Sequence, residues 1–491
     1  MIPTINTYLK RDEHYLSYKR IFIILSLVNS AVFFTFWFLE LQFGFRPEER
    51  VGWFFYGNDA HSYLDPIENL ISNGTYAMNS GPTAFRMPGF LPFYGPLYFL
   101  FGKSLGLNLF ALLNLVFHIG TTAIVFRLSH RFVSKIMAFA LAFGFALYPR
   151  LTMYGYMGMS EVLATFAMIF CVYQLLLWKS DKKASRAIWI SFFASVFVLL
   201  KPIGILFIAA LGVGLLIHMW LKKYPIRNAF KLLTLFFLTP TLVLSIWTYR
   251  NYQTFEAFIP LTPTLSSKGA DQAFRSFCRR TGQQFQSWQG KDARVWFVPP
   301  SSYMYDSVHA ASDPFPSYIY TSEFNLDTMR NLRSDWHLML SGQLSSEDSL
   351  AMDKSIENRF WKYAESFIDE HPFHFMVTIR LTFLKDFLMI KDSFSPFKQN
   401  TLMFKALRGY FMLSYYGLLL GLFAGLVALF FVKSFDARLI VGTALAFILI
   451  HVAMGRIENR YLLPAIPLFA IGFAILFKAY TDKLGKIKEI D

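Results

Sequence analysis

Apolar residues are gathered along this chain into about ten long runs, which short polar segments separate. A helix that crosses a bilayer needs about 20 mostly apolar residues, and fewer where neighbouring helices shelter it. The pattern therefore predicts an all-α polytopic membrane protein with about ten transmembrane helices. The runs span residues 20–43, 105–128, 132–149, 156–178, 186–200, 203–220, 229–248, 409–432, 437–454 and 461–479.

The first run resembles a signal peptide because basic residues precede it. It is too long for one, however, and bulky residues follow it where a cleavage site would need small ones. We therefore expect this run to be retained as the first transmembrane helix.

The basic residues of the short loops predict an orientation. Lys and Arg cluster at every second crossing, as in proteins that keep positively charged loops in the cytoplasm. The pattern predicts a multi-pass protein of a bacterial inner or cell membrane, with both termini in the cytoplasm. The clusters are the N-terminal tail, Arg127/Arg131/Lys135, Lys179/Lys182/Lys183/Arg186, Lys222/Lys223/Arg227/Lys231, Lys433/Arg438 and Lys478/Lys483/Lys486/Lys488.

The composition agrees with a chain that is largely surrounded by lipid. Of the 491 residues, 55% are hydrophobic and only 16% are charged, whereas soluble domains are roughly 25% charged. The net charge of +15 could indicate nucleic-acid binding, but the bases lie in short clusters between apolar runs. Membrane lipids are therefore predicted partners, and nucleic acid is not.

Residues 373–391 are apolar enough to suggest one more span. They carry Arg380, Lys385 and Asp386 in the middle of the run, where each charge costs about 2.5–3.5 kcal/mol at the bilayer centre. A span here would also reverse the orientation of every later loop. The segment is therefore predicted to be an interfacial helix on the outer surface.

This topology divides the chain into three regions. Residues 1–248 would form a seven-span module whose first outer loop, 44–104, contains a candidate catalytic Asp. Residues 249–408 would form an extracytoplasmic domain, either α-helical or mixed α/β, and residues 409–491 a three-span module with a cytoplasmic tail. A small core for the middle domain could be built from Trp288, Trp296, Trp336 and Trp361.

The chain contains two cysteines, Cys171 in an apolar run and Cys278 in the polar middle region. Two cysteines exclude a disulfide framework and a cysteine-based metal site. Because the two lie in such different surroundings, both are predicted to be free thiols.

The first outer loop contains Asp59, which opens a helical pattern in which Tyr63, Ile67 and Leu70 share one face. The glycine of Asn73-Gly74 would end this helix. A carboxylate at a helix start is favoured by the free N–H groups there, so Asp59 could simply be a helix cap. The alternative is a catalytic role.

Arg86 follows in the same loop, before an aromatic, proline-rich stretch that reaches Gly102. It could belong to a turn that leads into an interfacial helix. It could equally bind phosphate, because the guanidinium fork matches phosphate oxygens.

Further polar residues lie at the same predicted membrane face. Each of them alone could be a membrane anchor, a snorkelling base or half of an ion pair. Positive-inside sorting does not leave so many bases outside, and charges near lipid commonly face an internal cavity. The set therefore predicts a binding site, and its members are Glu161, Lys201, Trp247, Tyr249, Arg250, Arg456, Glu458, Arg460 and Tyr461.

A group of cations with carboxylates among them suits a phosphorylated lipid headgroup. Arg and Lys would hold the phosphate and stabilise it as a leaving group, while a carboxylate would accept the proton of an attacking hydroxyl. A nucleotide-sugar donor would instead predict a phosphate site on the cytoplasmic side. The sequence contains neither a P-loop nor a dinucleotide fingerprint there.

The order of these motifs resembles the GT-C glycosyltransferases, specifically the bacterial group similar to protein O-mannosyltransferases and the aminoarabinose transferase of lipid A. The likeness covers residues 1–260 and 409–480, and the motifs' order and membrane side give it weight. The motifs are NGTYAM and FRMPGF in the first loop, MSE at 159–161, LLKP at 199–202, WTYRNY at 247–252 and ENRYLLPAIP at 458–467.

The resemblance implies a polyprenyl-phosphate-sugar donor and inversion at the anomeric carbon. It implies that Asp59 is the general base and that Glu161 is a second acid, which orients the acceptor or a cation. The residues that it implies at the donor phosphate are Arg86, Lys201, Arg250, Arg456, Arg460 and Tyr461.

The chain departs from that family in its first loop. Many relatives carry an Asp-Glu pair there, whereas Asp59 is followed by Ala60 and His61. The partner function would fall to Glu161, Asp65 or His61. Glu458 is a further candidate for acceptor binding or support.

We therefore expect a hexosyl- or pentosyltransferase that moves a sugar from a polyprenyl-phosphate donor to a hydroxyl of an extracytoplasmic lipid, glycan or protein. One alternative is a transporter or lipid flippase, which predicts related halves. Others are a ligase with a pyrophosphate-linked glycan donor and a non-catalytic scaffold. No cofactor is certain: transfer would be metal-independent if Asp59 acts alone, and a divalent cation held by Asp59 and Glu161 is the alternative.

Overall fold

The computed structural model describes residues 17–43, 50–56, 59–221, 223, 225–262, 269–282, 293–302, 307–308, 315–389, 401–455 and 458–488. The chain forms two compact units. Unit 1 comprises residues 1–262, 395–450 and 460–491, and unit 2 comprises residues 263–394 and 451–459.

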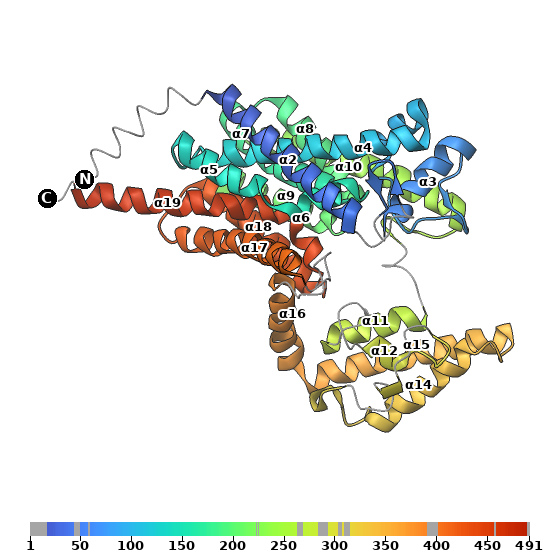
Figure 1. Cartoon of the computed structure of the whole chain (residues 1–491). Coiled ribbons are helices and arrows are strands. Elements are labelled where there is room, and N and C mark those ends of the chain that lie inside the picture. The colour runs from blue at the N-terminus through green and yellow to red at the C-terminus, as the bar shows by residue number, and fades with distance from the viewer. Residues whose placement is uncertain are drawn as a thin grey trace. The chain divides into compact units, whose positions relative to one another are not determined.

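Unit 1 is built from the apolar helices (Figure 1). Seven helices in the described part are long and apolar enough to cross a membrane, and the bent pair of α5 and α6, which meet at 52°, could form an eighth span. Two shorter apolar helices, α8 and α9, complete the set. The prediction of an all-α, multi-pass membrane protein is thereby confirmed. The bounds are α2 (Tyr18–Phe43), α4 (Leu91–Ser129), α5 (Lys135–Ala146), α6 (Pro149–Tyr156), α7 (Glu161–Asp181), α8 (Ala184–Leu200), α9 (Gly204–Leu221), α10 (Ile226–Phe255), α17 (Leu402–Ala428), α18 (Phe435–Ala453) and α19 (Ile466–Lys488), which follows the 3₁₀ turn η7 (Asn459–Ala465).

Two of the breaks between these helices fall at prolines. Tyr148 precedes Pro149 with ψ of 106°, and Lys201 precedes Pro202 with ψ of 97°. A residue before proline is pushed out of the α-helical region by the proline ring. The break at Pro202 therefore places Lys201 at the end of α8, where a side chain of this length can reach a neighbouring helix.

The described part of the loop between α2 and α4, which the sequence predicts to lie outside, folds locally. It contains the antiparallel pair β1 (Arg50–Val51) and β2 (Phe54–Phe55), the helix α3 (Ala60–Asn73), and the antiparallel pair β3 (Ala77–Met78) and β4 (Gly81–Pro82). Helix α3 ends at Gly74, whose φ of 72° lies in the left-handed region that favours glycine. The predicted end of this helix is confirmed.

Helix α4 changes direction at Gly102. This residue has φ of 70° and ψ of −178°, a conformation that only glycine adopts without strain. The proline-rich stretch before Gly102 is thereby set off from the long apolar segment that follows. Lys103 comes directly after the bend.

Helices α17 and α19 pack against each other in unit 1 (Figure 1). The backbones of α17 and α19 approach closely at Gly421 and Gly472, where a Cβ atom on either residue would overlap the other helix's backbone. Membrane helices commonly pack on such small residues, because without a hydrophobic driving force close van der Waals contact holds them together.

The described residues of unit 2 form helices joined by turns, and no strand is among them. Its elements are α11 (Ala270–Thr281), α12 (Ala293–Phe297), η4 (Ser317–Ile319), α14 (Leu326–Leu340), α15 (Ser346–Glu370), η5 (His374–Thr378) and α16 (Ile379–Leu388). Aromatic rings of Phe274, Phe277, Phe297 and Phe360 pack in its core. Trp296 and Trp336 are buried in this core and Trp361 packs against it, as predicted, while Trp288 lies outside the described residues.

The segment predicted to be an interfacial helix forms η5 and α16. The Arg380 guanidinium lies over the rings of Phe375 and Phe383 and donates a hydrogen bond to the carbonyl of Ala453. The position of this helix at a membrane surface stays a prediction. Elsewhere, Cys171 and Cys278 are buried and neither is in a disulfide, which confirms the expectation of unbridged thiols.

We predict that Gly472→Ala lowers the thermal stability of the protein, because the added methyl group would overlap the α17 backbone at Gly421. Overpacking of this kind typically costs about 1–3 kcal/mol. The measurement is thermal unfolding of the purified protein in detergent. Gly442→Ala in α18 is the matched control, since nothing lies within 4 Å of its Cβ position. Equal midpoints for the two variants would contradict this packing.

Candidate functional site

Asp59 lies at the N-cap position of α3, but its side chain does not cap the helix. Its Oδ1 is 3.2 Å from Nη2 of Arg86, and its Oδ2 is 2.8 Å from Nη1 of Arg460. The carboxylate is therefore held between two guanidinium groups, one from the same loop and one from the turn η7 near the end of the chain. These contacts go beyond the simple capping role that the sequence also allowed.

The two arginines control the protonation of Asp59. Partial burial raises the pKa of its carboxyl group, but the positive charges of Arg460, Arg86 and Lys201 outweigh this effect. The pKa of Asp59 consequently lies below its ordinary value, and the group is ionised at neutral pH.

Arg86 is itself fixed by three neighbours. Its Nε donates to Ser62 Oγ at 3.1 Å, and its guanidinium lies 4.6 Å from the centre of the Tyr63 ring. Its backbone carbonyl accepts a hydrogen bond from the Tyr76 hydroxyl. The contacts with Ser62 and Tyr63 orient the guanidinium without using all of its donors, so Arg86 can still bind an anion.

Glu161 and Lys201 form a second, drier ion pair. Lys201 Nζ lies 2.8 Å from Glu161 Oε1, and the two side chains are only 8% and 1% exposed. Glu161 is the first residue of α7, where the helix dipole favours a carboxylate. Its second oxygen, Oε2, is buried and accepts no hydrogen bond within the described residues.

A chain of contacts links this pair to Asp59. Ser160, which precedes Glu161, donates through Oγ to the Tyr63 hydroxyl at 3.3 Å. Lys201 Nζ lies 5.0 Å from the centre of the Tyr461 ring, and the Arg460 guanidinium lies 5.3 Å from the same point. The contacts close into a ring, here named the site cluster, made of Asp59, Tyr63, Arg86, Ser160, Glu161, Lys201, Arg460 and Tyr461.

Arg250 has a different environment. Its Nη2 donates to the carbonyl of Tyr76 at 2.6 Å, and its Nη1 donates to the carbonyl of Thr83 and to Asn251 Oδ1. These backbone partners flank the β3–β4 hairpin. In this structure Arg250 therefore ties the hairpin of the first loop to the end of α10.

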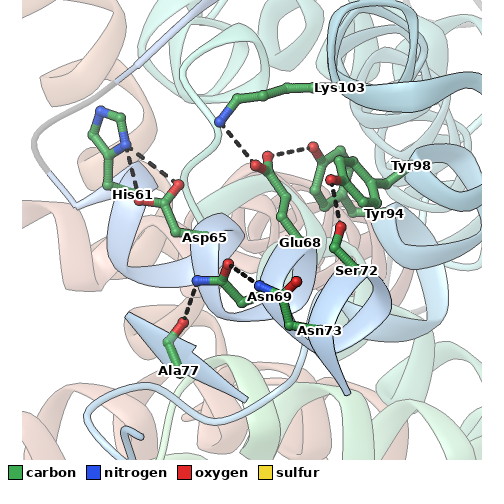
Figure 2. Close-up of polar contacts among 10 residues, drawn as sticks. All are labelled: His61, Asp65, Glu68, Asn69, Ser72, Asn73, Ala77, Tyr94, Tyr98 and Lys103. Atoms are coloured by element: carbon green, nitrogen blue, oxygen red, sulfur yellow. Dashed lines mark hydrogen bonds and ion pairs between the residues drawn. The ribbon is translucent and has the colours of Figure 1, made fainter. Parts of the chain in front are cut away.

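The opposite face of α3 carries a further set of polar contacts, which Figure 2 shows. Glu68 accepts hydrogen bonds from the Tyr94 hydroxyl at 2.7 Å and from Lys103 Nζ at 2.8 Å. Farther along the helix, Asn69 donates to the carbonyl of Ala77 at 2.8 Å. Helix α3 is thus fixed to α4 and to β3, and this fixes the start of the helix, where Asp59 lies.

The predicted support residues are distributed around this framework. His61 Nδ1 lies 3.3 Å from Asp65 Oδ2, and the His61 ring stacks on Tyr56 with 4.2 Å between ring centres (Figure 2 shows the first contact). Glu458 is buried and belongs to unit 2. Arg456 lies outside the described residues.

The sequence reasoning missed two parts of this arrangement. It placed Tyr63 on an apolar helix face, although a residue four positions after Asp59 lies on the same side of a helix. It also passed over Glu68 and Lys103, whose pairing depends on the bend at Gly102. No local motif indicates such a contact.

Comparison with known proteins gives matches to solved structures only. No protein-family model and no curated protein sequence matches the chain. The apo oligosaccharyltransferase of Archaeoglobus fulgidus matches with a TM-score of 0.49 at 12% identity, over 96% of this chain and 51% of that one. The same enzyme with an inhibitory peptide and a dolichol-phosphate matches with a TM-score of 0.49 at 13% identity, over the same shares of the two chains.

ArnT from Cupriavidus metallidurans, bound to undecaprenyl phosphate, matches with a TM-score of 0.37 at 11% identity, over 92% of this chain and 76% of that one. Both matched proteins are glycosyltransferases of the GT-C group, which the sequence motifs resemble. This chain spans about half the length of the oligosaccharyltransferase.

We predict that Lys201→Met destabilises the protein by about 3–5 kcal/mol, because it leaves the buried Glu161 carboxylate without its cation. The double variant Lys201→Met/Glu161→Gln should recover part of this loss, since no buried charge is then left unpaired. Thermal unfolding of the wild type, of Lys201→Met, of Glu161→Gln and of the double variant in the same detergent measures both effects. A double variant as unstable as the sum of the two single variants would contradict a coupled pair.

Proposed function

We propose that this protein is an inverting glycosyltransferase that moves a sugar from a polyprenyl-phosphate donor to a hydroxyl of an extracytoplasmic acceptor. The observation that carries the proposal is the Asp59 carboxylate between the guanidinium groups of Arg86 and Arg460. It combines a proton acceptor with two groups suited to phosphate in one part-exposed place. The donor class is the one that the sequence resemblance implies.

In the proposed reaction the acceptor hydroxyl attacks the anomeric carbon from the face opposite the phosphate. The bond between that carbon and the phosphate oxygen breaks as the new glycosidic bond forms, which inverts the anomeric configuration. Asp59 accepts the hydroxyl proton. The departing polyprenyl phosphate keeps the bonding electron pair, and Arg86 and Arg460 stabilise its negative charge.

The resting contacts suggest how donor binding would prepare the base. Asp59 at rest occupies both guanidinium groups and has a lowered pKa, which makes it a weak proton acceptor. A donor phosphate that takes over these contacts would release the carboxylate and raise its pKa. Binding of the donor would thus turn Asp59 into a better base.

Lys201 and Glu161, the buried pair of the site cluster, would support this reaction without exchanging partners. Lys201 is already paired, so its charge reaches the phosphate through space as a supporting cation. The free Oε2 of Glu161 can accept a hydrogen bond from an acceptor hydroxyl and thereby orient it. Tyr461 lies beside both Lys201 and Arg460 and would shape the phosphate site.

Basic side chains, rather than a metal ion, would balance the donor's charge in this scheme. Within the described residues no group of three or more His, Cys, Asp and Glu side chains could hold a metal ion. A divalent cation shared by Asp59 and Glu161 would have to compete with the bases that already pair with each acid.

Asp59→Asn is expected to lower sugar transfer by about 10²–10⁴-fold, the usual contribution of a general base. The measurement is sugar release from a panel of radiolabelled polyprenyl-phosphate sugars in membranes that contain either protein. Donor binding should persist, because Arg86, Arg460 and Lys201 remain. Asp181→Asn provides the matched control, since this acid pairs with Arg186 at the other end of α7.

The outcomes separate the alternatives. Turnover lost only in Asp59→Asn identifies the donor and supports the base. Equal turnover in all three proteins removes Asp59 from the chemistry. If no monophosphate donor reacts but a pyrophosphate-linked glycan does, the protein is the alternative ligase. If lipid transport proceeds without any sugar release, the protein is the alternative transporter.

The pH dependence of the reaction should differ between its two kinetic parameters. The free enzyme holds the pKa of Asp59 low, so kcat/KM should stay high at acidic pH and fall only below the usual range of a carboxyl group. In the donor complex the arginines face the phosphate, so the acid limb of kcat should lie at higher pH. Acid limbs at the same pH for both parameters would contradict the release of Asp59 by the donor.

A further inference from the structure

A basic hollow lies at the end of unit 1 opposite to the site cluster. It has a volume of about 460 Å³, within the range of small-ligand pockets. It lies where α4 and α7 end, where α18 begins and near the end of α19. Its lining residues are Arg131, Phe132, Lys179, Phe431, Val432, Lys433, Ser434, Asp436, Lys478 and Asp482.

The hollow is well separated from the candidate active site. Glu161 begins α7 and Lys179 lies in its last turn, and 18 helical steps between them correspond to about 27 Å. The hollow is therefore a second site and no extension of the first.

Basic side chains outnumber acidic ones in this hollow. Asp436 lies 2.6 Å from Nη2 of Arg131 and 2.7 Å from Nζ of Lys179, so one carboxylate pairs with two bases and neutralises only one of their charges. Lys478 pairs with Asp482 in an exposed contact that contributes little. Four bases and two acids leave two net positive charges.

Lys433 carries the charge that is most available to a ligand. It is exposed, and no hydrogen bond or ion pair joins it to another described residue. Next to it, Ser434 Oγ accepts the N–H of Ala437 at the start of α18, where the helix dipole also favours an anion.

Apolar side chains border the bases. Phe431 lines the hollow and is 61% exposed, and the adjacent Phe430 is 83% exposed. Cations beside exposed rings match an amphiphile whose anionic head meets the bases while its chains lie along the rings. Basic pockets between membrane helices bind anionic lipid headgroups in this way.

We infer that this hollow binds a phosphate-bearing anion, supplied by the headgroup of an anionic phospholipid or by free phosphate. The headgroup contacts Lys433 and Lys478 and adds its charge to the cluster that Asp436 already organises. The anion thereby links the start of α18 to α19, while Asp436 links α18 to Arg131 after α4 and to Lys179 of α7, and the bundle is stabilised independently of sugar transfer.

The experiment follows thermal unfolding of the full-length protein in detergent micelles while one additive is titrated. Phosphatidylglycerol is the anionic lipid, phosphatidylcholine the zwitterionic control, and inorganic phosphate the headgroup chemistry without chains. The expected result is a rise of the unfolding midpoint with phosphatidylglycerol and none with phosphatidylcholine. A comparable rise with inorganic phosphate alone also supports the site and assigns free phosphate as its ligand.

Variants then locate the effect. Lys433→Gln/Lys478→Gln should weaken the apparent affinity for phosphatidylglycerol on the order of thirtyfold, at about 1 kcal/mol per base near a membrane surface. Lys354→Gln/Lys362→Gln in α15 removes the same charge from exposed positions of unit 2 and should leave the affinity unchanged. Lys433→Gln alone, which breaks no contact between described residues, should weaken it about fivefold.

Equal stabilisation by both lipids would overturn the inference, because headgroup charge would then be irrelevant. Equal loss of affinity in the two double variants would overturn it as well, because the effect would come from total charge rather than from this hollow. Since none of these readouts involves sugar transfer, failure of the proposed enzymatic function leaves this test intact.

Discussion

The candidate site depends on one interaction, the carboxylate of Asp59 held between two guanidinium groups. Arg86 comes from the same loop, but Arg460 comes from η7, close to the end of the chain. The ion pairs thus join the loop between α2 and α4 to the turn that leads into α19, the last apolar helix. With side chains 17–26% exposed, these pairs are only partly shielded from water, so an incoming anion can compete for them. An entirely dry pair would resist such an exchange, because one charge would be left buried and unpaired.

The site cluster therefore has an exchangeable half and a fixed half. Asp59, Arg86 and Arg460 can be rearranged by a ligand, whereas Glu161 and Lys201 are almost fully buried and pair directly. The fixed half stabilises the ends of α7 and α8 against each other, and Tyr63 connects the two halves through Ser160 and Arg86. On the other face of α3, the contacts of Glu68 with Tyr94 and Lys103 hold the helix, so that an exchange of partners at Asp59 need not displace it.

Much of this fold could be read from the sequence, because apolar runs and prolines act locally. The helices occupy the runs that hydropathy marks, and Pro149 and Pro202 coincide with breaks. The membrane side and order of the charged motifs also brought Asp59, Glu161, Lys201 and Arg460 into one set. The sequence could not predict which residue each of these charged side chains contacts. Arg250 binds backbone carbonyls far away in the chain, and the residue types there do not predict such a contact. The close approach of Gly421 to Gly472 depends on how α17 and α19 cross.

The charges at the site cluster would also explain why the sequence keeps bases on the predicted outer face, where positive-inside sorting would not leave them. Three bases, Arg86, Lys201 and Arg460, surround two acids, Asp59 and Glu161, which leaves one net positive charge. A polyprenyl-phosphate sugar is a phosphodiester with one negative charge, so its arrival would make the cluster neutral. A donor that carried a pyrophosphate would instead leave excess negative charge, unless a further cation were supplied. In the proposed function, one net positive charge would therefore match a monophosphate donor better than a pyrophosphate donor.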